Sequence, residues 1–94
     1  GTGHKVMVLE VPQGKSVKRG QAVNAKAELS DGTDLFGIVL ETVDGTAAKT
    51  KTTVVVFGEV IFEGLELKAT TAKADFIKKA RDKGIIVKEL GGRY

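Results

Sequence analysis

The sequence predicts an α+β fold that is mainly β with one α-helix near the C-terminus. Short runs of Val, Ile, Phe and Thr, bounded by turn residues, are typical of β-strands and fill most of residues 12–67. From residue 70 the apolar spacing changes to that of a helix, and a β-branched run at 85–88 follows it. With 94 residues, the chain suits one domain with a single core.

We therefore expect a single domain over residues 1–94. Its predicted parts are an N-terminal arm or strand over 1–11, a β-rich core over 12–67, a helix over 70–83, a terminal strand over 85–88 and a frayed tail over 91–94. A domain of this size buries roughly 60–65% of its unfolded surface, so association with a partner would add useful stability.

The first part of the chain alternates between apolar runs and turns. The apolar run 5–11 ends at Pro12, which has no N–H to donate to a sheet. Residues 21–29 alternate weakly and predict a strand, and the Asp-Gly turn at 30–34 is typical of a hairpin connection to the strand that follows.

The centre of the sequence predicts two strongly apolar strands, 35–44 and 52–62, joined by an exposed and mobile loop at 44–51. The second strand is apolar at four successive positions, Val54, Val55, Val56 and Phe57. A half-exposed strand alternates, so this run predicts that both faces are covered. In so short a chain we expect the second cover to come from another subunit.

The helix is predicted from spacing and end signals. Ala72, Phe76, Ile77 and Ala80 fall on one face. Thr70 or Thr71 is expected to cap the N-terminus, and Gly84 is expected just past the C-terminus.

Charge is unevenly distributed over a net +3. Residues 1–67 hold seven Lys/Arg and nine Asp/Glu, hence −2, whereas residues 68–94 hold eight and three, hence +5. The basic part allows weak nucleic-acid binding as an alternative function. We favour the solvated face of one helix, because cations suit its last turn and the region has few aromatic residues to stack bases. The residues concerned are Lys73, Lys78, Lys79, Arg81 and Lys83.

The residues that carry chemistry are sparse, and the sequence predicts no enzyme, no metal and no cofactor. His4 is the single histidine and lacks carboxylate neighbours to orient it as a base. There is no cysteine, and Asp31 and Asp34 lack the spacing of a calcium loop. No apolar run reaches the ~20 residues of a membrane span. We therefore expect no small-molecule substrate and no membrane partner.

Residues 14–21 (GKSVKRGQ) resemble the turn of biotinyl and lipoyl carrier domains. Those domains carry the cofactor on a lysine within a Met-Lys-Met or Asp-Lys-Ala motif, and neither motif occurs here. A stand-alone small β binding module therefore stays open as a second alternative.

A longer resemblance covers roughly residues 12–88. The segments that carry it, in order, are 17–20 (VKRG), 36–44 (FGIVLETVD), 53–60 (TVVVFGEV) and 83–87 (KGIIV). Together they resemble the tailed-phage head decoration proteins of the lambda head decoration type, including head-fibre base domains. The family often carries a longer polar N-terminal arm than the ten or so residues present here.

This resemblance implies a small β-barrel or sandwich-like domain of the β-tulip kind. It implies a homotrimer on three-fold and quasi-three-fold sites of the capsid exterior, which binds the major capsid protein and stabilises the shell against internal DNA pressure. The protein would lie in the host cytoplasm before assembly and on the outer surface of the virion afterwards. The run Val54, Val55, Val56 and Phe57 would then combine core packing with the trimer interface.

An apolar arm ahead of a Pro-Gln-Gly break also suggests how such a protein could bind. Pairing with a strand edge of the capsid would give affinity through backbone hydrogen bonds and specificity through alternate side chains. The hypothesis assigns this role to Lys5, Val6, Met7, Val8 and Leu9.

Overall fold

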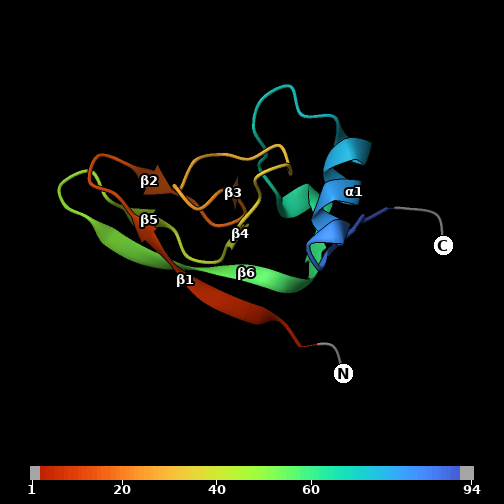
Figure 1. Cartoon of the computed structure of the whole chain (residues 1–94), viewed down its shortest axis with the longest axis horizontal. Coiled ribbons are helices and arrows are strands. Elements are labelled where there is room, and N and C mark those ends of the chain that lie inside the picture. The colour runs from red at the N-terminus through yellow and green to blue at the C-terminus, as the bar shows by residue number, and fades with distance from the viewer. Residues whose placement is uncertain (1–2, 92–94) are drawn as a thin grey trace.

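The computed structural model describes residues 3–91 and is a mainly β domain with one α-helix (Figure 1). The predicted mainly β α+β class is therefore confirmed. The strands are β1 (Lys5–Val11), β2 (Ser16–Val17), β3 (Ala22–Val23), β4 (Gly37–Val39), β5 (Val43–Asp44), β6 (Thr50–Ile61) and β7 (Ile85–Lys88). The helices are the 3-10 turn η1 (Phe62–Gly64) and α1 (Lys73–Asp82).

Strand β6 organises the sheet. Its first half lies between β1 and β4 in the order β1-β6-β4-β3, all antiparallel, and its last four residues pair with β7 in parallel. Strands β2 and β5 form a separate two-stranded sheet. Figure 1 shows β1 running beside β6, with α1 at the end of the molecule where β6 finishes.

Two apolar clusters lie on the two faces of β6. Val54 belongs to one, with residues of β1 to β4 and the loop after β3: Leu9, Val11, Val17, Val23, Ala27 and Val39. Val55 belongs to the other, with residues of α1, β7 and the segments around β3 and β4: Ala22, Leu35, Ile38, Phe76, Ala80, Ile85 and Val87. Consecutive strand residues point to opposite faces, so one apolar run serves both clusters.

This arrangement corrects the expected source of cover for the apolar run. Val54 and Val55 are 0% and 3% exposed, and the chain's own residues cover both of them. Another subunit is therefore not needed there, and these two side chains act as core. Val56 is half-buried, and Phe57 is the member that reaches the surface, at 45% exposure.

The strand expected over 21–29 is wrong beyond Val23. The Asn24 Oδ1 accepts the backbone N–H groups of Lys26 and Glu28 at 2.9 and 3.0 Å. A short polar side chain that satisfies nearby backbone groups competes with a sheet ladder, and here it turns the chain. The antiparallel pairing predicted for the hairpin is nevertheless present, because Ala22 pairs with Ile38.

The predicted threonine cap of the helix is also wrong. The N-cap of α1 is Ala72, which makes no side-chain cap hydrogen bond. The Thr71 hydroxyl instead donates to the carbonyl of Lys68 at 2.5 Å, within the turn before the helix. At the other end Gly84 takes a φ of +93° and donates its N–H to the carbonyl of Arg81.

The loop expected over 44–51 is shorter than predicted. Asp44 pairs with Ser16 between β5 and β2, and β6 already begins at Thr50, so residues 45–49 remain as the connection. In the frayed tail expected over 91–94, residues 92–94 lie outside the described residues.

Candidate functional site

The segment predicted as a binding arm is a strand of the domain itself. Residues 5–11 pair along their length with residues 50–57 of β6, with one irregularity between Lys5 and Val6. Of the two predicted alternatives, an arm or a strand, the structure has the strand. The physical reason is that Leu9 and Val11 are 4% and 0% exposed in the core, so the strand cannot leave without opening it.

The outer edge of β1 is the end of the sheet. In the described part of the chain, β6 is its one neighbouring strand. The Leu40 N–H donates to the Thr53 carbonyl at 2.9 Å, so the backbone groups of Thr53 point towards β4. Val8 lies opposite Thr53 on the other side of β6. In an antiparallel ladder such a pair is not hydrogen-bonded, so the N–H and C=O of Val8 point outward.

The same alternation applies along the strand. Backbone groups of alternate residues point the same way, so Val6, Val8 and Glu10 present their N–H and C=O groups at the outer edge. Met7 and Leu9 instead bond to β6. The edge therefore offers a strand-addition site about three residue pairs long.

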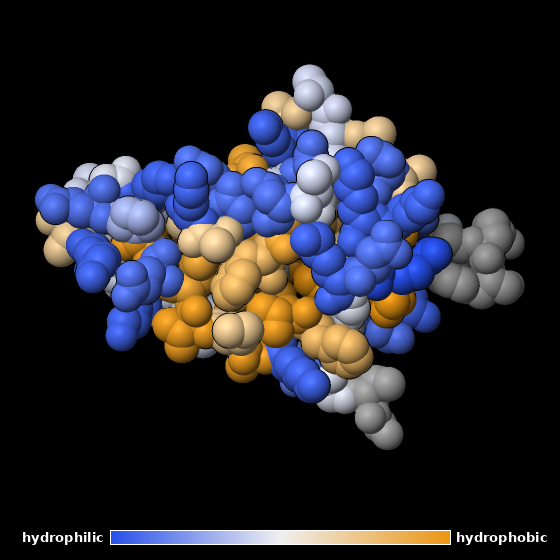
Figure 2. Space-filling model, in the orientation of Figure 1, coloured by the Kyte–Doolittle hydropathy of each residue, from blue (hydrophilic) through white to orange (hydrophobic). Residues whose placement is uncertain are grey.

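Exposed apolar side chains surround this edge. Val6, Met7 and Val8 are 52%, 50% and 59% exposed, and Phe57 lies nearby on β6 opposite Lys5. We call these four residues the β1 patch. Figure 2 shows apolar atoms gathered along the lower part of the molecule, where Figure 1 draws β1 and β6, with hydrophilic residues around them.

Natural edge strands are usually protected by charges, proline or bulges. Here the one irregularity lies at the Lys5 end, and no charge interrupts the three residues between Lys5 and Leu9. An unprotected apolar edge of this kind is a candidate interaction surface.

The packing around Phe57 holds one end of this patch in place. The Lys5 Nζ lies 5.4 Å from the centre of the Phe57 ring, within the range of a cation–π contact. The ring also lies against the backbone after α1, since a Cβ on Gly84 would come within 2.6 Å of it. Phe57 thus contacts both the start of β1 and the backbone that follows α1.

His4 makes structural contacts with β6. Its Nε2 donates to the carbonyl of Glu59 at 2.6 Å, and its ring packs over Gly58, where a Cβ would come within 2.6 Å. It lines one end of an apolar hollow of about 380 Å³. The other lining residues include Arg19, Ile38, Leu40, Val55, Glu59, Val60 and Leu65. Within residues 3–91 no group of His, Cys, Asp or Glu side chains could hold a metal ion.

Known families give no further guide to this surface. The chain matches no known family model and no curated protein. Within the part of the chain that the structure describes, no helix is long and apolar enough to cross a membrane.

The basic helix is partly engaged within the domain. Lys73 forms an ion pair with Glu89, and Lys79 contacts the Asp75 carboxylate at 3.2 Å and the Thr33 hydroxyl at 2.9 Å. Lys78, Arg81 and Lys83 are exposed. Part of the charge run therefore tethers the helix to its surroundings.

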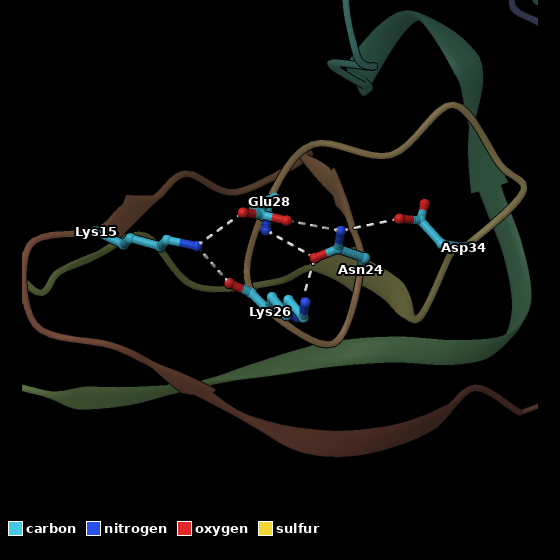
Figure 3. Close-up of polar contacts among 5 residues, drawn as sticks. All are labelled: Lys15, Asn24, Lys26, Glu28 and Asp34. Atoms are coloured by element: carbon cyan, nitrogen blue, oxygen red, sulfur yellow. Dashed lines mark hydrogen bonds and ion pairs between the residues drawn. The ribbon is translucent and has the colours of Figure 1, made fainter.

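A polar network missed at the level of sequence organises the loop after β3 (Figure 3). Asn24 lies at its centre: the Nδ2 donates to Glu28 at 3.2 Å and to Asp34 at 2.9 Å. Lys15 reaches across to the Glu28 carboxylate at 3.2 Å and to the carbonyl of Lys26 at 3.0 Å. The available signal was an Asn directly after an apolar pair, a residue typical of turns.

This network predicts an acid-dependent stability. The Ser30 hydroxyl, which donates to Asp34 at 2.6 Å, and the Asn24 amide lower the pKa of that carboxyl below its ordinary value of 3.8. The stabilisation is therefore present above about pH 4 and is lost as the pH falls through the lower, folded-state pKa. We expect Asp34→Asn to flatten the fall in melting temperature below pH 4, measured by circular dichroism. An acid profile as steep in the variant as in the wild type would contradict the assignment.

Proposed function

We propose that this chain is a structural virion protein, a phage head decoration protein that binds the major capsid protein on the outside of the shell. The observation that carries the proposal is the outer edge of β1, where the exposed apolar residues Val6, Met7 and Val8 lie beside backbone groups that point outward. The order of the decoration-like segments in the sequence supports it. The proposal includes a small barrel- or sandwich-like domain of the β-tulip kind, no enzymatic activity and no cofactor.

The corrected role of residues 5–9 fits such docking. A capsid segment in extended conformation would add to the outer edge of β1 through the backbone groups of Val6 and Val8. Because β1 is already ordered by its pairing with β6, binding would cost less conformational entropy than ordering a flexible arm. Val6 and Val8 on one face and Met7 on the other would contact the capsid side chains.

Trimer formation belongs to the same proposal. Three copies at a three-fold or quasi-three-fold site multiply a weak single contact by effective concentration. Since Val54 and Val55 are buried within the chain, Phe57 is the member of the apolar run that could contact a neighbouring copy. Such a trimer would bridge capsid subunits and stabilise the shell against internal DNA pressure. Before assembly the protein would lie in the host cytoplasm.

Co-sedimentation with expanded capsids tests this function. We expect Val8→Asp to weaken binding at least tenfold, because it places a charge at the centre of the docking edge. Lys78→Glu on the exposed face of α1 is the matched control and should bind as the wild type does. Wild-type protein that stays in the supernatant would refute the proposal. Salt-dependent DNA binding lost in Lys78→Glu would favour the nucleic-acid alternative instead.

A further inference from the structure

We propose that, in the free protein, the outer edge of β1 pairs with β1 of a second copy to form an antiparallel two-fold dimer. One continuous sheet would then run through both subunits. This inference goes beyond the proposed function, because it concerns what covers the edge before any shell is present.

The direction of the backbone groups fixes how two copies can pair. A two-fold axis perpendicular to the sheet leaves each sheet face on the same side in both copies. Each residue must therefore lie opposite a residue of the partner whose side chain is on the same sheet face. Centred on Met7, this rule places Val6 opposite Val8 of the partner subunit, and Val8 opposite the partner's Val6. Both residues point their N–H and C=O outward, so the two pairs are hydrogen-bonded and exchange about four bonds.

Side chains fit the same register. Met7 faces Met7 of the partner subunit as a non-hydrogen-bonded pair, where side chains approach most closely. The three exposed apolar residues of β1 thus all meet apolar residues. At the ends Glu10 lies opposite the partner's His4, and Lys5 lies opposite the partner's Leu9. No like charges oppose each other, so the edge is complementary to itself, as an isologous contact requires.

The charges of β1 favour a second copy as the occupant. Lys5 lies at one end of the strand and Glu10 near the other, so an antiparallel copy brings opposite charges towards each other. Such a contact is small, and we expect a weak dimer that forms with rising concentration. On a shell, a capsid strand would compete for the same edge.

A proline at position 8 separates this pairing from the fold. The Val8 N–H points outward and takes no part in the ladder with β6, so Val8→Pro removes a donor from the edge and leaves the domain's own ladder intact. Val8→Ala shortens the same side chain but keeps the N–H, and is the matched control. By sedimentation velocity at up to about 1 mM, we expect dimers for wild type and Val8→Ala. For Val8→Pro we expect a dissociation constant raised at least tenfold.

Amide hydrogen exchange of the wild type gives a second readout that needs no variant. The amides of Val6 and Val8 should exchange more slowly as concentration rises, whereas Met7 and Leu9, bonded to β6, should be protected at every concentration. A monomer throughout the range, or exchange at Val8 that ignores concentration, would overturn the inference. So would a trimer that Val8→Pro leaves unchanged.

Failure here is distinguishable from failure of the proposed function. If the protein is a monomer that binds capsids, the dimer is refuted and the decoration function is kept. If it is a dimer that does not bind capsids, the decoration function is refuted and the dimer is kept.

Discussion

Phe76→Ala is expected to destabilise the domain by about 3–5 kcal/mol, a large part of the stability of a small domain. Phe76 is the aromatic residue of α1 and is 0% exposed. It joins the helix to the cluster that contains Val55 and Ile85, so its loss leaves a cavity between helix and sheet. Urea unfolding followed by circular dichroism measures the change in the free energy of unfolding.

The matched control is Phe57→Ala, because that ring is 45% exposed. We expect it to cost about 1 kcal/mol, since much of its apolar surface is already in contact with water. Equal losses in the two variants would contradict the assignment of Phe76 to the core and of Phe57 to the surface. A lower slope against urea in Phe76→Ala would indicate either a change in the compactness of the native or unfolded state or unfolding that is no longer two-state.

The sequence predicted those features that depend on local spacing. Phe76 and Ala80 lie four residues apart in a helical pattern, and both are buried on the inner face of α1. The N-terminal cap of α1 was harder to predict, because Thr70 and Thr71 are equally good candidates by residue type. The deciding factor is the preceding turn, in which Thr70 takes a φ of +67° and neither hydroxyl caps the helix.

Long-range pairing escaped the sequence analysis. The apolar run in residues 5–11 indicates a strand but does not identify β6, about 40 to 50 residues later, as its partner. Missing long-range contacts explain two outcomes together. Without the residues of α1, β7 and the loop after β3 that pack on its faces, β6 was expected to need cover from another subunit. Without β6 beside it, the segment 5–11 could be predicted as an arm or as a strand.

The candidate site was predictable in the same limited way. Residues 5–9 were predicted as a binding segment because they form an apolar run ahead of a Pro-Gln-Gly break. Which backbone groups point outward depends on the bond between Leu40 and Thr53, on the far side of β6. No pattern within β1 carries that information.

Gly20→Ala is expected to cost about 2–5 kcal/mol of the free energy of unfolding. Gly20 takes a φ of +92°, which L residues rarely adopt, and this alone costs about 1–2 kcal/mol. An added Cβ would also lie 2.2 Å from the carbonyl oxygen of Gly64, so the backbone must shift at a further cost of about 1–3 kcal/mol. The shift matters because Gly20 bonds to Val39 on one side and Glu66 on the other.

Gly14→Ala isolates the first of these costs, the conformational one. Gly14 has nearly the same φ, +93°, but nothing lies within 4 Å of a Cβ built there. We therefore expect the conformational cost of about 1–2 kcal/mol alone, and the difference between the two variants measures the close approach to Gly64. Equal losses would show that the 62–66 segment yields easily. A larger loss in Gly20→Ala would show that Gly20 is required for close packing of its own turn against Val39 and the 62–66 segment. The glycine would then be explained by this packing and not by a resemblance to carrier domains.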